Sequence, residues 1–416
     1  MSSDPAPRLR RDLLRHGVAA TAGLGLGGIA GRHGRAEDAP PGREEFVIAT
    51  VVDRESGTPL QNGAQLAIDA VNASGGILKR RLRLRTEVTN LTRGNIRAAA
   101  IDVASRVVGE DDLIAVIGHH AVADALPAAI TYLRRDAVLI TPGISTTALT
   151  MHGLKNLFAM LPDNAELSTQ TARFVANLGN RRAMILRERG VEALEVSLAY
   201  RDAAAKLQIT IADEASLPSV HHVRNVTPRL QALKIDHVVL ICPLDWQIEI
   251  VRFITTLGLN VLCVLPTIEN AVLVQKELTR ALGATTSAPF RNRVLMPVLR
   301  DPRSPTPTQA EWERAYQERF RIPASDYAMQ GTDAVGVIVE ALRIVGRIGS
   351  PGQDVAGARK ELVENMIRVM HGELAYRGVG GRMSFRRNGR MYTRMLGFAS
   401  IRSPEERDTA YYLPGA

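Results

Sequence analysis

The sequence predicts an α/β fold of two doubly wound lobes, each built on a parallel sheet. Short β-branched runs alternate with longer segments of helical apolar spacing from Phe46 onward. This alternation starts again after Pro162, which indicates a second lobe of similar size. Apolar residues make up 45% and charged residues 23% of the 416 residues, enough apolar material for two cores. Alternating strands and helices are typical of a parallel sheet covered on both faces.

The first lobe is expected to hold four strands and three helices. Its second strand alternates leucine with arginine over 81–89, which indicates a position at the edge of the sheet. Gly75 and Gly76 follow the first helix and end it. In chain order we expect strand 46–52, helix 62–73, strand 81–89, helix 96–108, strand 113–117, helix 123–133 and strand 138–141.

The second lobe repeats the pattern, and long helical segments follow it. Thr227 is placed to cap a short helix that has Pro228 at its first position. Asn388-Gly389 indicates the turn of a hairpin near the end of the chain. We expect helices at 167–178, 194–207, 228–233, 247–257, 308–320, 327–347 and 355–370, strands at 183–186, 209–212, 237–242, 261–265 and 293–298, and a hairpin of 382–390 with 395–401.

Charge and composition exclude several classes of function. The net charge is +9, of which the first 36 residues carry +4, and the rest is too weak for a nucleic-acid footprint. Aromatic residues are only 4% of the chain, which disfavours base-stacking platforms. The Gly-x-Gly-x-x-Gly pattern over 23–28 has no strand before it, so it does not indicate a dinucleotide site. We expect no cofactor and no metal.

The N-terminus has the pattern of an export signal. Arg10-Arg11 and Arg15 precede an uncharged, glycine-rich stretch over 17–31, which resembles a twin-arginine signal peptide. Cleavage after Ala36 would release a mature chain into the periplasm; the alternative is a basic disordered tail. No other stretch reaches the ~18 apolar residues that cross a bilayer, so we expect no membrane span in the mature form.

Adjacent histidines and the two cysteines are weaker candidates. Neighbours on an extended strand point to opposite faces, so His119-His120 and His221-His222 are poor chelators. We expect Cys242 and Cys263 to be free thiols near the ends of neighbouring parallel strands. Aligning the prolines that follow these strands leaves the cysteines two residues out of register. Their Cα atoms would then be about 8 Å apart, whereas a disulfide needs less than about 7 Å.

The strand end at 141–143 delivers Ser145 and two threonines to the start of a helical run. In open α/β sheets, ligands bind outside the carboxyl ends of strands. Hydroxyls together with the free amides of a helix start form a receptor for a carboxylate or similar group. The sequence therefore predicts that Ser145 binds an anionic or carbonyl end of a ligand; the alternative is that Ser145 only caps the helix.

Several segments together resemble a known family, the type I periplasmic binding proteins of branched-chain amino-acid ABC transporters. The similarity runs from about Phe46 to Ile401, and the order and spacing of the segments are specific. The resemblance implies two lobes joined by three crossovers, with the ligand closed between them. The segments that carry it are Asn62–Ile77, Val116–His119, Leu139–Leu149, Tyr327–Ala334 and Gly378–Gly389.

The resemblance also implies an organisation and a role. The chain would be a monomeric periplasmic receptor, not an enzyme, that delivers a small polar solute such as an amino acid, an amide or a related carboxylate to an inner-membrane ABC permease. Alternatives are a ligand sensor of the same fold and a secreted α/β enzyme. The implied division is an export signal 1–36, first lobe 45–162, second lobe 163–298, a return to the first lobe 299–372, a closing hairpin of the second lobe 373–405 and a tail 406–416.

By resemblance, Ser145 contacts the ligand carboxylate, and Tyr327 forms an aromatic wall. His120, Ala121, Val122 and Gly143 would line the same wall as Ser145.

Some positions depart from the pattern of the family. Val122 replaces a usual serine, Glu192 replaces a tyrosine, and Thr267 replaces the acid that holds the ammonium, with Glu269 two residues on. These departures disfavour a plain aliphatic amino acid. Glu192, Asp245 and Glu269 would instead meet a cationic or hydroxylated ligand; the alternative is that they are solvated carboxylates at loop tips. Trp246 would lie at the mouth of the cleft or pack against a helix.

Overall fold

The computed structural model describes residues 45–412 except 54–56, 90–94, 269–270, 283–293, 301–304, 349–353, 372–375, 393–395 and 402–409. The chain divides into two compact units, 1–38 and 39–416, and every described residue lies in the second unit. The expected export signal therefore lies outside the described residues. Among the helices that the structure describes, none has the length and apolar character to span a membrane.

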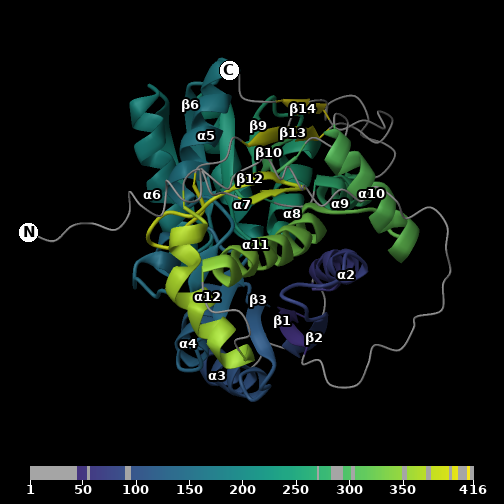
Figure 1. Ribbon diagram of the computed structural model, residues 1–416. Helices are drawn as coiled ribbons and strands as arrows, with labels where there is room; N and C mark the ends of the chain where they lie inside the picture. Colours follow the sequence, from purple (N-terminus) through teal and green to yellow (C-terminus); the bar gives the residue numbers. More distant parts are fainter. Residues whose placement is uncertain are drawn as a thin grey trace, which may run out of the picture. The chain divides into compact units, whose positions relative to one another are not determined.

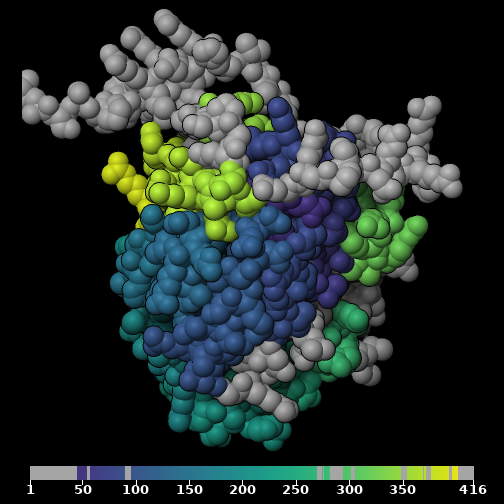
Figure 2. All heavy atoms as spheres, turned by 60° about the horizontal axis from the view of Figure 1, so that its bottom comes forward, coloured from purple at the N-terminus to yellow at the C-terminus, as the bar shows by residue number. Residues whose placement is uncertain are grey.

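The first lobe is a five-stranded parallel sheet in the order β2-β1-β3-β4-β5. Helix α11 packs against α2, and α12 packs against β3 and β4 (Figure 1). Figure 2 shows α12, in yellow-green, beside the blue part of the chain that holds α3 and α4. The elements are β1 (Phe46–Asp53), α2 (Thr58–Ala73), β2 (Leu82–Thr89), α3 (Ile96–Val107), β3 (Leu113–Gly118), α4 (Val122–Leu133), β4 (Val138–Thr141), β5 (Leu157–Ala159), α10 (Pro307–Phe320), α11 (Asp326–Ile348) and α12 (Val355–Val369).

The second lobe is a seven-stranded sheet in the order β14-β13-β10-β9-β8-β6-β7. Its first five strands along the chain run parallel, and β13 and β14 add an antiparallel edge. The elements are α5 (Asn164–Asn177), β6 (Arg182–Arg187), α6 (Val191–Lys206), β7 (Thr210–Ser216), α7 (Val223–Ala232), β8 (His237–Ile241), α8 (Leu244–Thr256), β9 (Leu262–Val264), α9 (Ala271–Leu282), β10 (Val294–Val298), β13 (Gly397–Ile401) and β14 (Ala410–Tyr412).

The predicted fold class is confirmed. Strands β3 and β8 are buried along their whole length, as expected for parallel strands with both faces covered. Each lobe has its own core of aliphatic residues between sheet and helices. The strand with alternating arginines, β2, lies at the edge of the first sheet, as its sequence pattern predicts.

Two local predictions were wrong. Helix α7 begins at Val223, after a 3-10 turn over Val220–His222, so Thr227 lies inside the helix and does not cap it. The Thr227 hydroxyl donates to the carbonyl of Val223 at 2.8 Å, one turn earlier. Pro228 therefore lies inside the helix and not at its first position, and its missing N–H leaves the helix without the bond to the carbonyl of Arg224. The sequence analysis also missed β5, α9 and β14.

The expected closing hairpin differs in its partner strand. Asn388-Gly389 forms a tight turn between bridged Phe385 and Met391, as predicted. However, the strand that follows, β13, pairs with β10. A separate hairpin of β11 (Tyr376–Gly378) and β12 (Gly381–Met383) packs against α11 of the first lobe. Among the described residues after α12, the chain joins the second sheet at β13.

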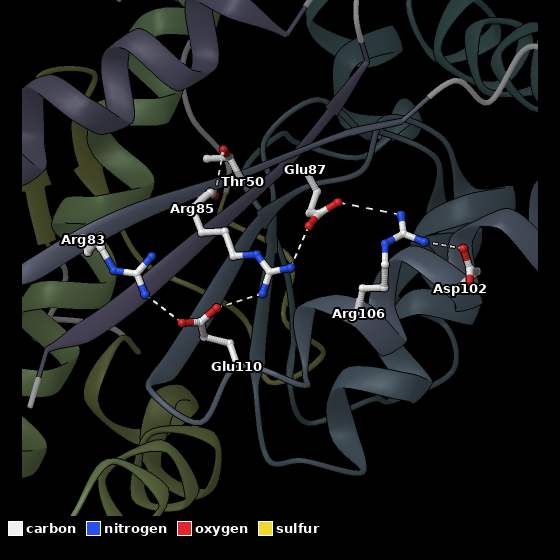
Figure 3. Close-up of polar contacts among 7 residues, drawn as sticks. All are labelled: Thr50, Arg83, Arg85, Glu87, Asp102, Arg106 and Glu110. Carbon is white, nitrogen blue, oxygen red and sulfur yellow. Dashed lines mark hydrogen bonds and ion pairs between the residues drawn. The ribbon is translucent and has the colours of Figure 1, made fainter.

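Strand β2 presents a chain of ion pairs along the edge of the first sheet (Figure 3). Glu110 accepts from Arg83 at 2.6 Å and from Arg85 at 2.9 Å. Glu87 in turn pairs with Arg85 at 2.7 Å and with Arg106 at 3.7 Å. Alternating charges of this kind oppose edge-to-edge pairing with another sheet.

We expect Glu110→Gln to reduce stability slightly and in a pH-dependent way. Burial opposes ionisation of Glu110, but the two arginines outweigh it and lower the pKa of the carboxyl. Because the pKa is lower in the folded state, the stabilisation is present above the unfolded pKa of ~4.3 and is lost as pH falls through the folded value. Urea unfolding should show a loss of about 0.5 kcal/mol at neutral pH, since the pair is solvent-screened.

The same loss should be absent at pH values below the folded pKa of Glu110. Glu364→Gln is the control, because this exposed glutamate lies on α12, away from the arginines. A loss that does not change between neutral and acidic pH would show that the ion pairs are not its cause.

Candidate functional site

A small pocket lies at the carboxyl ends of strands from both sheets. Its volume is about 180 Å³. The loops after β3 and β4 form one wall, and the segments after β6, β8 and β9 form the other. The described residues that line this interlobe pocket are His120, Ala121, Val122, Gly143, Ile144, Ser145, Thr146, Asn164, Glu188, Glu192, Ala193, Val196, Ile241, Cys242 and Thr267.

The structure brings together most of the residues that the sequence singled out. The first lobe supplies the wall predicted around Ser145, and the second lobe supplies two further predicted positions. Their contact with a ligand stays a prediction. The predicted residues that line the pocket are His120, Ala121, Val122, Gly143, Ser145, Glu192 and Thr267.

The remaining predicted residues lie beside the pocket or apart from it. Tyr327, at the start of α11, supports the wall: its hydroxyl is 3.1 Å from Nε2 of His120, and its ring lies beside Gly143. Asp245 and Trp246 lie in the first turn of α8 and are not among the lining residues; Trp246 packs against the core of the second lobe. Glu269 lies outside the described residues.

Three polar lining residues were missed by the sequence analysis. Glu188 follows β6 directly, and the rule that ligands bind beyond the carboxyl ends of strands could have identified it. Cys242 follows β8 in the same way but was considered in the sequence analysis only as a free thiol. Asn164 opens α5, and nothing in its local sequence places it near the loop after β4.

The loop after β4 is built differently from the predicted helix start. A short 3-10 helix covers Thr147–Thr150, and Thr146 occupies its N-cap position, so Ser145 neither opens nor caps it. The Thr147 amide donates to Oε1 of Glu195 at 2.8 Å, and the Thr146 hydroxyl donates to the other carboxylate oxygen. Asn164 donates to Oε1 as well, at 3.1 Å. A carboxylate from α6 thus already accepts the hydrogen bond of the amide that we expected to bind the ligand.

Arg390 holds this loop in place from the turn after β12. Its guanidinium is buried and donates to the carbonyls of Ile144 at 2.8 Å and Thr146 at 2.5 Å. A third hydrogen bond, of 3.3 Å, reaches the carbonyl of Leu161, where the chain passes from β5 to α5. Arg390 therefore ties the pocket loop to the connection between the lobes.

A buried cluster fixes the loop after β3, in the same wall of the pocket. His119 has a positive φ of 59°, and its two ring nitrogens lie 3.0 Å from Asp124 and 3.0 Å from the Tyr132 hydroxyl. Asp124 also accepts from the amide of Ala121 at 2.9 Å. His119 therefore faces the core while His120 faces the pocket, but the cause is the left-handed backbone at His119 and not the extended strand that the sequence analysis expected. Among the described residues there is no cluster of three or more side chains suited to a metal.

Comparison with known proteins identifies the family. A family model described as "Periplasmic binding protein" matches residues 50–404, most of the chain. The chain belongs to the periplasmic binding protein family. Two curated relatives of this periplasmic binding protein are an amino acid binding protein of Pseudomonas aeruginosa, 28% identical over 116 residues, and the Leu/Ile/Val-binding protein BraC3 of Rhizobium johnstonii, 25% identical over 186 residues.

These alignments cover 28% and 44% of this chain, and only 30% and 49% of the relatives. Solved structures extend the likeness to the whole fold. An ABC transporter substrate-binding protein from Desulfitobacterium hafniense, in complex with Leu, has a TM-score of 0.72 at 20% identity and covers 88% of this chain and 100% of its own. A solute-binding protein from Rhodopseudomonas palustris, in complex with 3,4-dihydroxybenzoic acid, has a TM-score of 0.69 at 13% identity. That match covers 90% of this chain and 97% of the other. At these identities the likeness shows the fold alone.

The pocket of this periplasmic binding protein has an acidic wall. Burial, together with the charges of Glu195, Glu188 and Asp124, raises the pKa of Glu192. Burial lowers the pKa of His120, so its ring is neutral at pH 7. No lysine or arginine is among the described residues that line the pocket.

The two cysteines are free thiols, as predicted. Cys263 pairs in register with Val238, which lies four residues before Cys242. The separation along the strands is therefore twice what the aligned prolines indicated, which makes a disulfide still less compatible with the fold. Burial, with the charges of Glu188 and Asp245, raises the pKa of Cys242 to about 12.

Proposed function

We propose that this chain is the periplasmic receptor of an ABC importer and binds a small polar solute in the interlobe pocket. The observation that carries the proposal is that both lobes line one small cavity at the carboxyl ends of their strands. A solute that touches both walls stabilises the closed arrangement by its greater affinity for it. Family membership supports the periplasmic location and the role as a receptor.

The same proposal covers export and the class of solute. Residues 1–36 would direct the chain across the membrane, and residues 37–416 would act as a monomer that meets the permease. An amino acid, an amide or a related carboxylate would fit the size of the pocket. A binding role is favoured over catalysis because the family model that matches most of the chain describes a binding protein.

We expect Ser145→Ala to weaken solute binding about ten- to a hundredfold. Ser145 lines the pocket, and losing a hydrogen bond to a charged group costs about 1.5–3 kcal/mol. Titration calorimetry would use the solute that most raises the melting temperature among amino acids, amides, polyamines and aromatic acids. Ser105→Ala is the control, since this exposed hydroxyl bonds only within α3, to the carbonyl of Ile101. If Ser145→Ala binds as the parent does, this pocket is not the solute site.

A further inference from the structure

The loop after β4 contains the groups with which this pocket would hold an anion, and another part of the chain already fills them. The Thr146 hydroxyl and the Thr147 amide both donate to the carboxylate of Glu195, and the buried Asn164 donates to it as well. Glu195 comes from α6 of the second lobe. A solute carboxylate that used these donors would have to displace Glu195 and would meet its like charge at close range.

The charges that remain free to meet a solute are negative. Glu188 and Glu192 line the pocket from the second lobe, and no described lining residue is a lysine or arginine. In the part of the chain that the structure describes, ion pairs of the second lobe engage other acids, namely Asp213, Glu214, Asp236, Glu249 and Glu277.

Local structure brings the two carboxylates to the same side of the pocket. Glu188 is the first residue after β6, and Glu192 lies in the first turn of α6, with Gly190 at the N-cap between them. Oε1 of Glu188 lies only 3.2 Å from where a Cβ on Gly190 would be, so this side chain folds back over the turn. The charge of Glu188 contributes to the raised pKa of Glu192, as expected for two carboxylates near one another in a partly buried place.

Resting on the proposed function, we propose that the solute of this pocket carries a cationic group, an amine or a guanidinium, bound by Glu188 and Glu192. A cation there would compensate the two carboxylates and would make charge-assisted hydrogen bonds to them. The wall of Val122, Ile144, Val196 and Ile241 suits a short aliphatic body. The neutral His120 supplies no competing positive charge.

The test uses pairs of small solutes that share a carbon skeleton and differ in charge. The probes are butylamine and butyrate, isopentylamine and isovalerate, and putrescine and succinate, added to the unmodified mature chain at pH 7 and low salt. We expect the amines to raise the melting temperature and their carboxylate counterparts to leave it unchanged. Added salt should reduce the effect, because charge pairs near a surface are screened.

Two variants connect the effect to the named carboxylates. Calorimetric affinity for the best amine should fall about ten- to a hundredfold in Glu192→Gln and further in the double variant with Glu188→Gln. Asp202→Asn is the matched control, because it removes the same charge from an exposed position of α6 outside the pocket, and its affinity should equal that of the parent. Far-ultraviolet circular dichroism verifies that each variant is folded.

The outcomes separate this inference from the proposed function. If only carboxylates stabilise the chain, and Ser145→Ala weakens their binding, the pocket is a solute site but the proposed cationic class of solute is wrong. Amine binding that both glutamate variants leave unchanged would also overturn the inference. If no amine, carboxylate, amino acid or amide stabilises the chain, both the inference and the proposed function are contradicted.

Discussion

Arg390→Met is expected to lower the free energy of unfolding by about 3–5 kcal/mol. The Arg390 guanidinium is buried and donates to the carbonyls of Ile144, Thr146 and Leu161. Burial lowers its pKa to about 10, offset in part by Asp163 and Glu195, so the group stays charged at pH 7. Methionine fills a similar volume but leaves these buried carbonyls without their donor, at ~1–3 kcal/mol each.

Chemical denaturation with a matched control measures this effect. Arg387→Met makes the same substitution at an exposed position three residues earlier and should change stability by less than about 0.5 kcal/mol. Arg390→Lys keeps the charge, but a lysine lacks the planar fork that reaches three carbonyls. Its loss of stability should therefore lie between those of Arg387→Met and Arg390→Met. If Arg390→Met is as stable as Arg387→Met, the guanidinium does not hold the pocket loop.

Gly63→Ala is expected to cost about 3 kcal/mol or more, although alanine is the better helix former. Helices α2 and α11 cross so closely that a Cβ on Gly63 would lie 1.8 Å from the carbonyl oxygen of Ala328. On the partner helix, a Cβ on Gly331 would lie 2.2 Å from the carbonyl of Leu60. The obstacle is backbone on both sides, so the helices themselves must separate.

The direction in which Gly63→Ala changes the free energy of unfolding tests this account. In an open helix, glycine to alanine stabilises by about 1 kcal/mol, so a loss of stability on thermal or urea unfolding requires the close crossing. Ala73→Gly, at the exposed end of α2, measures the effect of helix propensity without a change in packing. It should cost less than about 1 kcal/mol of stability. A stabilised Gly63→Ala variant would show that the helices can separate at no cost.

Helix α11, which crosses α2 at Gly63, also carries residues that support the pocket. Tyr327 and Gln330 lie on α11, and Gln330 donates to the carbonyl of Pro142 at 2.6 Å, beside the loop that carries Ser145. A shift of α11 would therefore displace the wall around His120 and Tyr327. We expect Gly63→Ala to weaken solute binding as well as stability.

Most of the fold could be predicted because its signals are local. Strands buried on both faces have continuous β-branched runs, and the edge strand β2 has alternating arginines, so both were identified correctly. The closing hairpin was assigned a wrong partner because β13 pairs with β10, which lies about a hundred residues earlier in the chain. Pairing over that distance leaves no mark in the local sequence.

The site was predictable where it follows strand ends and not where it depends on contacts between distant segments. His120, Gly143 and Ser145 follow β3 and β4 and were expected in one wall. Glu195 is 48 residues from Thr147, so its occupation of that amide could not be inferred from the loop sequence. The consequence is large, because it changes the expected charge of the solute.

A crystal structure of the mature chain with the solute that stabilises it most tests the central claim most directly. The account predicts electron density for the solute inside the interlobe pocket, in contact with Ser145 on the first lobe and with Glu192 on the second. Density at another place, or bound to one lobe alone, would contradict it.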